Sequence, residues 1–108
     1  IKDLAAEGLI HRQTYLVLTT RNVDVDVAGL PALLETDAAY IGVIGSRRRW
    51  ETTRKQLLEL GIPEERISSI HSPVGLEIQA ETPKEIALSI LAQIIMVRQG
   101  GDGSSMAA

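Results

Sequence analysis

The stretch YIGVIGSRRRWETTRKQLLEL, residues 40–60, decides the fold that the sequence predicts. Its first five residues, Tyr40–Ile44, form a short apolar run with β-branched side chains bounded by glycine, which is typical of a buried strand. Residues 47–60 are mostly good helix formers, with Ser46 placed as the N-cap and Gly61 as the stop. The stretch therefore predicts a strand, a tight turn and a helix.

Three adjacent arginines, Arg47, Arg48 and Arg49, open the predicted helix. A helix N-terminus presents unpaired N–H donors, and guanidinium groups bind phosphate or carboxylate, so this pattern indicates an anion site. Arg47 directly follows the Ser46 cap, whereas Arg48 and Arg49 are expected to point to solvent or to the flank of the sheet. A solvated basic surface is the alternative, because cations oppose the dipole at this end of a helix.

Composition limits the class of protein. The 108 residues, 44% of them hydrophobic and with a net charge of −3, predict a small globular domain without a nucleic-acid signature. The absence of cysteine from the sequence excludes disulfides and thiolate metal sites, and His11 has no second ligand at metal spacing. We found no signal peptide and no apolar run long enough to span a bilayer, so we expect a cytoplasmic protein with no membrane or nucleic-acid partner.

The rest of the chain alternates helical and extended patterns. We expect a helix over residues 1–13, a strand over 14–20, a polar connection over 21–25, a helix within 26–35, a helical turn over 63–67, an extended stretch over 68–81 and a helix over 83–99. Because Pro31 lies within the second helical pattern, that helix either begins near Gly29 or bends at the proline.

The last helix has the clearest local signal. Thr82 is a capping residue, Pro83 suits the first helical position, and Glu85 completes a capping box. This role explains Glu85 better than a ligand role does. An apolar stripe follows at helical spacing, which indicates core or interface, and it consists of Ile86, Ala87, Ile90, Leu91, Ile94 and Ile95.

Only two convincing strands are present, and two strands cannot bury both faces and edges of a sheet flanked by helices. We therefore expect an α/β fold that is the second half of a doubly wound parallel sheet and is incomplete on its own. Residues 1–100 are assigned to the domain and residues 101–108 to a flexible tail. The missing strands are expected from upstream residues or from another chain, and the apolar stripe favours a homo-oligomer.

Three motifs carry a resemblance to a known family. The motifs at Ile41–Arg47, Ser72–Ile78 and Thr82–Ile90 together resemble the C-terminal Rossmann-type domain of the xanthine dehydrogenase accessory proteins, the XdhC/CoxI family. The resemblance extends from about Thr14 to Gln99. The chain has Gln79 where the family usually has glycine, and Thr-Arg-Asn at residues 20–22 where the family often has Thr-His-Asp.

The resemblance implies a Rossmann-like fold and a function. Members of the family bind the molybdenum cofactor, a molybdopterin, and help to insert it into xanthine dehydrogenase-type molybdenum hydroxylases, so the apoenzyme is the expected partner. The implied role is that of a chaperone rather than an enzyme. The cofactor-binding residues that the resemblance favours are Gly45, Ser46, Arg47, His71, Ser72 and Gly75. A purely structural role for His71 stays open, and Gly75 is expected to adopt a backbone conformation that other residues avoid.

Two other functions stay open. The first is an NAD(P)- or nucleotide-dependent oxidoreductase or transferase, but Gly42–Ser46 matches neither the dinucleotide fingerprint nor a P-loop. No acid–base pair is recognisable, and Ser46 has no histidine base nearby in the sequence, so no catalytic residue and no metal ligand are assigned. The second is a fragment that only completes a sheet and an oligomer interface.

Overall fold

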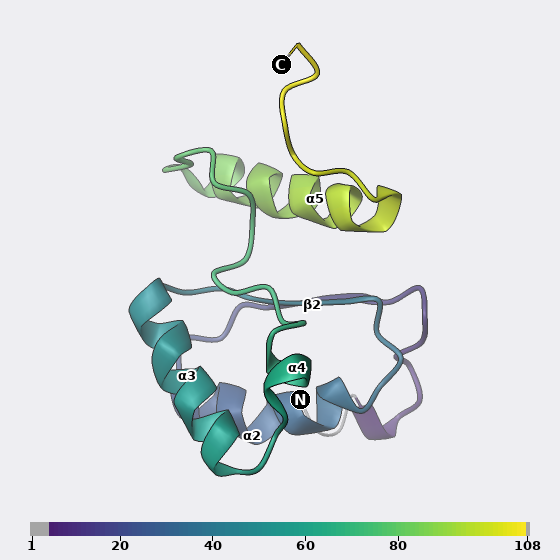
Figure 1. Ribbon diagram of the computed structural model, residues 1–108, viewed down its shortest axis with the longest axis vertical. Helices are drawn as coiled ribbons and strands as arrows, with labels where there is room; N and C mark the ends of the chain where they lie inside the picture. The colour runs from purple at the N-terminus through teal and green to yellow at the C-terminus, as the bar shows by residue number, and fades with distance from the viewer. Residues whose placement is uncertain (1–4, 108) are drawn as a thin grey trace. The chain divides into compact units, whose positions relative to one another are not determined.

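The computed structural model describes residues 5–107 (Figure 1). The chain consists of two compact units, Ile1–Pro73 and Val74–Ala108. Among the described residues, no helix is both long and apolar enough to cross a membrane.

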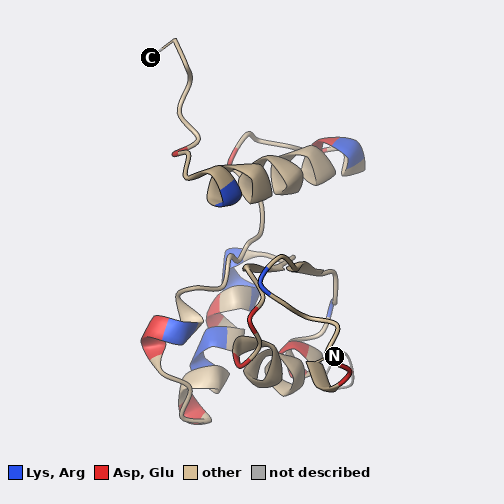
Figure 2. Cartoon of the chain, turned by 90° about the vertical axis from the view of Figure 1, so that its right-hand side faces the viewer, with Lys and Arg blue, Asp and Glu red and all other residues tan. Residues whose placement is uncertain are grey.

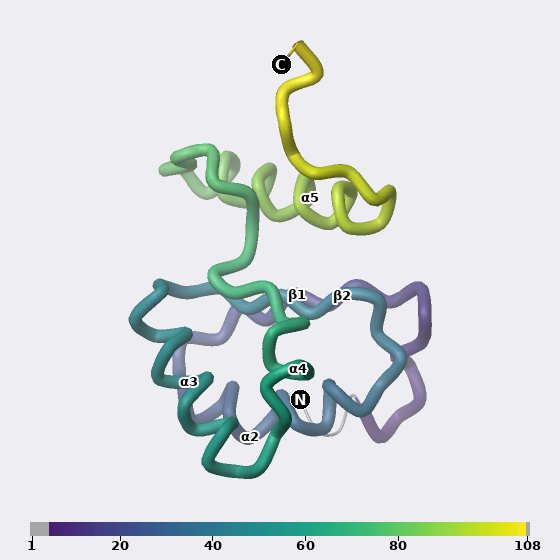
Figure 3. The backbone as a smooth tube through the Cα atoms, in the orientation of Figure 1, coloured from purple at the N-terminus to yellow at the C-terminus, as the bar shows by residue number. Residues whose placement is uncertain are grey.

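The first unit contains a parallel sheet. Strand β1, Tyr15–Leu18, pairs with β2, Tyr40–Val43, in a register that places Tyr15 opposite Tyr40. The two strands lie side by side in Figure 3. On the other edge of β2, the N–H of His71 donates to the carbonyl of Ile41 and the N–H of Val43 donates to the carbonyl of His71, both at 2.9 Å. Strand β2 is therefore central, and all four of its residues are buried.

Three helices cover one face of this sheet: α2 (Val23–Leu34), α3 (Arg47–Glu59) and the short α4 (Glu64–Ile67) (Figure 1). Apolar side chains from the strands and helices form one cluster, whose buried members are Leu18, Leu30, Leu33, Ile41, Val43, Leu57, Ile67 and Ile70. The alternation of side chains along a strand places Ile41 and Val43 on the same, helix-covered face. The predicted α/β fold with a parallel, Rossmann-like sheet is confirmed.

The predicted strand–turn–helix unit is confirmed with slightly shorter ends. Ser46 is the N-cap of α3, and its Oγ accepts a hydrogen bond from the N–H of Arg49 at 3.1 Å. After the C-cap Leu60, the chain leaves the helix through Gly61, whose φ of +90° lies in the region that glycine tolerates best.

The N-terminal part of the first unit differs from the sequence prediction. Within the expected helix over residues 1–13, only residues 5 and 6 of the described part are helical, and residues 1–4 lie outside the described residues. The chain turns at Gly8, which has a φ of +68°, and the Nδ1 of His11 accepts from the N–H of Gln13 at 3.1 Å in a further turn. A positive φ ends a helix, so the weak apolar pattern around Leu9 misled the prediction.

Helix α2 begins earlier than expected. The side chain of Asn22 accepts from the N–H of Asp24 at 2.8 Å and caps the helix, so helical structure starts at Val23 within the predicted polar connection. Pro31 lies inside α2, which rules out a helix start near Gly29. The sequence signal for this start was an asparagine followed by acidic residues, a common N-terminal pattern.

The second unit consists of α5, Pro83–Gln99, and the segments on either side of it. The predicted capping box is present: Thr82 Oγ1 accepts from the N–H of Glu85 at 3.2 Å, and the Glu85 carboxylate accepts from the N–H of Thr82 at 3.0 Å. The helix stops at Gly100 in a left-handed conformation, as expected. The colouring of α5 in Figure 2 marks charged residues only near the two ends of the helix.

The apolar stripe on α5 is only partly covered. Ile86, Ile90 and Ile94 are half-buried, whereas Leu91 and Ile95 are 57% and 51% exposed. Leu88 is also exposed.

Candidate functional site

The candidate site lies where the two parallel strands end. Strand β1 leads through Thr20 into α2, and β2 leads through Gly45 into α3, so both helices begin at the carboxyl edge of the sheet. Ligands of open α/β sheets collect at this edge. The two helix ends differ in charge: the first turn of α2 contains Asp24 and Asp26, whereas the first turn of α3 contains no acidic residue.

Gly45, Ser46 and Arg47 form the turn into α3 and are all exposed. Gly45 has a φ of +147°, and a Cβ atom added to it would lie 3.4 Å from the Cδ of Arg49. Ser46 uses its side-chain oxygen as the helix cap. Among the described residues, neither Arg47 nor Arg48 takes part in an ion pair. This turn therefore carries positive charge that the fold itself does not neutralise.

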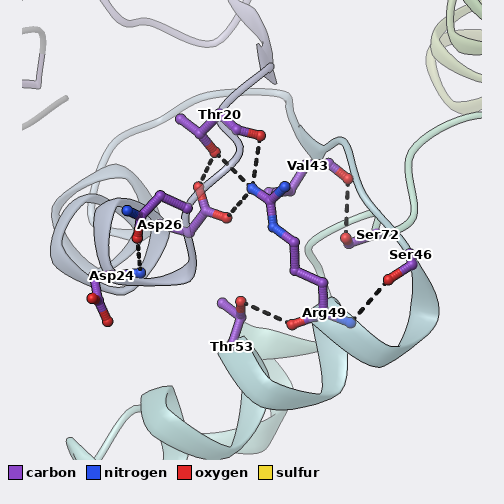
Figure 4. Close-up of polar contacts among 9 residues, drawn as sticks. Thr20, Asp24, Asp26, Val43, Ser46, Arg49, Thr53 and Ser72 are labelled. Atoms are coloured by element: carbon purple, nitrogen blue, oxygen red, sulfur yellow. Dashed lines mark hydrogen bonds and ion pairs between the residues drawn. The ribbon is translucent and has the colours of Figure 1, made fainter.

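The sequence analysis expected Arg49 to point either to solvent or to the flank of the sheet. It does not point to solvent, because its guanidinium reaches across to the loop after β1 (Figure 4). Its Nη2 donates to the Thr20 carbonyl at 2.7 Å, to Thr20 Oγ1 at 3.2 Å and to Asp26 Oδ2 at 3.1 Å. The Arg49 side chain is 21% exposed and the Asp26 side chain 1%. The third arginine of the run thus links α3 to the loop after β1 and to α2, whereas Arg47 and Arg48 are exposed and make no ion pair among the described residues.

Sequence reasoning missed Asp26 and Thr20. Asp26 is fully buried, and its carboxylate also accepts a hydrogen bond from the hydroxyl of Thr20. The sequence analysis assigned Asp24 to a polar connection and Asp26 to the start of a helix, and nothing in the alternation VDVDV at residues 23–27 marked Asp26 as the buried one. The signal that could have found the pair is an acid, Asp26, eight residues after the end of β1 at Leu18, together with the three arginines that follow β2.

His71 and Ser72 lie along the edge of β2, with His71 paired to Gly42 and Ser72 at the carboxyl end of the strand. The His71 ring stacks on the ring of Tyr40, with centroids 4.7 Å apart, and burial lowers the pKa of the imidazole. Burial also raises the pKa of Tyr40 to about 12. The hydroxyl of Ser72 donates to the carbonyl of Val43 at 3.0 Å. Ser72 is therefore held at the carboxyl end of β2, next to the turn that contains Gly45.

Gly75 belongs to the second unit, where it packs on α5. Its N–H donates to Gln93 Oε1 at 3.1 Å, and its carbonyl accepts from Gln93 Nε2 at 3.0 Å. Its φ is +107°, and a Cβ atom there would lie 2.5 Å from the Oγ of Ser89. The expected special backbone conformation is present, and the close approach to α5 explains the need for glycine.

The carboxyl edge thus combines a positively charged helix N-terminus, backbone N–H groups and a serine hydroxyl within the first unit, whereas the His71 ring lies on Tyr40, the first residue of β2. This donor set can bind an anion. Among residues 5–107, no group of three or more histidine, cysteine, aspartate or glutamate side chains could hold a metal ion.

Comparison with known proteins gives relatives over most of the chain. The chain is 40% identical over 103 residues to "Uncharacterized protein YqeB" of Escherichia coli, covering 94% of this chain and 19% of that protein. It is 31% identical over 94 residues to "Molybdenum cofactor insertion chaperone PaoD" of Escherichia coli, covering 87% of this chain and 30% of that protein. The chain therefore spans less than a third of either relative.

A solved structure has the same fold. The crystal structure described as a xanthine dehydrogenase from Bacillus halodurans superimposes with a TM-score of 0.70 and 35% sequence identity, over 95% of this chain and 29% of that chain. The family model of the XdhC Rossmann domain matches residues 2–94. With a parallel sheet, helices that begin at its carboxyl edge and this match over most of its length, the chain belongs to the XdhC Rossmann-domain family.

Proposed function

We propose that this chain is part of a protein that binds the molybdenum cofactor and assists its insertion into molybdenum hydroxylases of the xanthine dehydrogenase type. The observation that carries the proposal is the similarity to PaoD, which is named as a molybdenum cofactor insertion chaperone. The similarity to a solved structure titled as a xanthine dehydrogenase supports the class of partner. On this proposal the protein delivers the cofactor and does not itself turn over a substrate.

The charge of the carboxyl edge fits a phosphorylated ligand. The carboxylates of Asp24 and Asp26 compensate the positive end of the α2 dipole, whereas α3 begins with arginines and has no acidic residue in its first turn. A phosphate at this end of α3 would accept from backbone N–H groups and from a guanidinium, and it would offset the unfavourable placement of cations there. The cofactor itself supplies the molybdenum and the redox chemistry of the hydroxylase after transfer.

Each residue of the proposed site has a distinct task. Gly45 lets the backbone turn close to the ligand, Ser46 orders the first turn of α3, and Arg47 supplies charge. Ser72 borders the site at the carboxyl end of β2, and His71 extends the same edge through its backbone pairing with Gly42, while its ring, whose pKa burial lowers, lies on Tyr40. Gly75 is not included, because both of its backbone polar groups are bonded to Gln93.

The test is a binding and transfer experiment. Purified protein is loaded with molybdenum cofactor, the bound cofactor is quantified after gel filtration, and the loaded protein is then mixed with a cofactor-free xanthine dehydrogenase-type hydroxylase. We expect cofactor to be retained and hydroxylase activity to appear faster than with free cofactor alone. Steady turnover of a substrate with NAD(P) by this protein, without retention of the cofactor, would contradict the proposal and support the nucleotide-dependent enzyme.

A further inference from the structure

One ion pair joins the first turns of two helices that are far apart in sequence. Asp26 lies in the first turn of α2 and Arg49 in the first turn of α3, with 3.1 Å between Oδ2 and Nη2. Asp26 is buried, so its charge is compensated by the guanidinium and by the hydroxyl of Thr20 rather than by water. The pair therefore fixes the spacing between the two helix ends at the carboxyl edge.

Arg49 also contacts both loops that form this edge (Figure 4). Toward β1, its Nη2 donates to the carbonyl of Thr20 at 2.7 Å. Toward β2, its backbone N–H donates to the Oγ of the cap Ser46, and its side chain passes close enough that a Cβ atom added at Gly45 would lie 3.4 Å from its Cδ. A Cβ atom at position 45 would be in ordinary contact with the Arg49 chain, so it is the φ of +147° that calls for glycine at this turn.

We infer that Arg49 is a positioning residue for the cofactor site: it holds the loop after β1 against the turn before α3, and Asp26 neutralises its charge so that Arg47 and Arg48 remain the cations available to the ligand. This inference rests on the proposed function. It divides the run of three arginines into two exposed residues, Arg47 and Arg48, and a third, Arg49, that holds the turn in place.

Substitution of the Asp26–Arg49 pair should have different effects if Arg49 only stabilises the fold and if it also positions the binding site. A buried ion pair can often be replaced by apolar residues of similar size with little loss of stability, whereas removal of one partner leaves a buried charge uncompensated. The double variant Arg49→Met with Asp26→Leu therefore separates the two roles. It removes both charges together and leaves the carbonyl of Thr20 without its guanidinium donor.

The experiment compares this double variant with wild type and with Arg54→Met. Arg54 is a matched control, because it lies on the same helix and its ion pair with Glu64, at 2.7 Å, is exposed and lies away from the first turn. Three quantities are measured on each protein: the thermal midpoint, the Kd for molybdenum cofactor, and hydrogen–deuterium exchange of the segments 19–22 and 44–48.

For the double variant we expect a thermal midpoint near that of wild type, a Kd about tenfold higher, which corresponds to the loss of about one well-placed contact, and faster exchange in both segments together. Arg54→Met should change none of the three by a comparable amount. A double variant that binds the cofactor as wild type does, or whose two segments keep the wild-type exchange rate, would overturn the inference.

Two further outcomes are separable. If wild type does not bind the cofactor, the proposed function fails, while the exchange data still decide whether Arg49 couples the two loops.

If the double variant does not fold, Thr20→Val takes its place, because it keeps the ion pair and removes only the hydroxyl that bonds both charged groups. We then expect a Kd about threefold higher, or roughly 0.6 kcal/mol, and faster exchange over residues 19–22, and unchanged values would count against the inference.

Discussion

The ring of His71 stacks on the ring of Tyr40, with 4.7 Å between the centroids and 12° between the planes. His71 also pairs with β2 through its backbone, on the edge of β2 that is opposite β1. The ring contact therefore places a titratable side chain against the sheet. Burial lowers the pKa of that imidazole below its ordinary value. The stack therefore couples the stability of the first unit to pH.

The first prediction concerns this coupling. With a folded-state pKa below the unfolded value of about 6.5, the unfolded chain binds the proton more readily, so the contribution of His71 is fully present above the unfolded pKa and is lost as the pH falls from there through the folded-state pKa. Urea denaturation at pH 7.5 and pH 5.5 should show a smaller pH dependence for His71→Phe than for wild type. An equal loss in both proteins would mean that groups other than His71 cause it.

The second prediction concerns Arg47. Arg47→Ala should raise the Kd for molybdenum cofactor about tenfold to a hundredfold, because one or two charge-assisted hydrogen bonds of about 1.5 kcal/mol or more are lost. The thermal midpoint should stay near the wild-type value, since Arg47 is exposed. Arg47→Lys should restore only part of the affinity, because the ammonium lacks the fork of donors.

The control for Arg47 is Arg66→Ala, which removes an exposed cation from the last turn of α4. Titrations at two salt concentrations complete the comparison. Equal and strongly salt-dependent losses for both variants would indicate a diffuse basic surface instead of a site at the start of α3.

The third prediction concerns Arg49→Ala. This single change leaves the carboxylate of Asp26 buried without its cation, so we expect the free energy of unfolding to fall by about 3 kcal/mol. Arg47→Ala and Arg49→Ala should therefore differ in stability: the first weakens binding and leaves the fold stable, whereas the second also weakens the fold. Equilibrium urea unfolding of the two variants checks this, and equal stabilities would show that the pair contributes little.

The fourth prediction concerns Gly75. Gly75→Ala combines an unfavourable positive φ with a Cβ atom 2.5 Å from Ser89 Oγ, so it should destabilise α5 and its loop by about 2 kcal/mol. Ser89→Ala in the same chain removes the closest atom and should recover part of this loss. A double-mutant cycle measured by denaturation gives the coupling, and strict additivity of the two changes would contradict the contact.

The fifth prediction concerns assembly. Leu88, Leu91 and Ile95 are exposed on α5, and an exposed apolar helix face favours association. We expect a dimer or larger species by light scattering at micromolar concentration, and a shift toward monomer for Leu91→Glu with Ile95→Glu. A particle of 11.7 kDa for the wild-type chain would contradict this expectation.

The elements whose signals lie within a few residues could be predicted from the sequence. The strand–turn–helix unit at Ser46 and the capping box of Thr82 and Glu85 follow from neighbours three residues apart. The turn at Gly8 was missed because a weak apolar periodicity outweighed a single glycine. In each of these cases the deciding interaction is local.

The interior of the candidate site could not be predicted in the same way. Asp26 and Arg49 are 23 residues apart, and only the pairing of β1 with β2 brings them together. Nothing in the run Arg47 to Arg49 marks the third arginine as the one that bonds to the loop after β1, because helical rotation alone does not say where a neighbouring loop lies. The resemblance to a family supplied the candidate residues but not this division of roles.

The capping box at the start of α5 also has a consequence for folding kinetics. Both ends of this 17-residue helix are specified by residues next to them, with Thr82 and Glu85 at the start and Gly100 at the stop. Such a segment can gain helical structure from local contacts, within microseconds, whereas pairing β1 with β2 first requires closing a loop through α2. A synthetic peptide of residues 80–101 should therefore show helical circular dichroism that Thr82→Ala diminishes, which would make α5 an early-forming element of the chain.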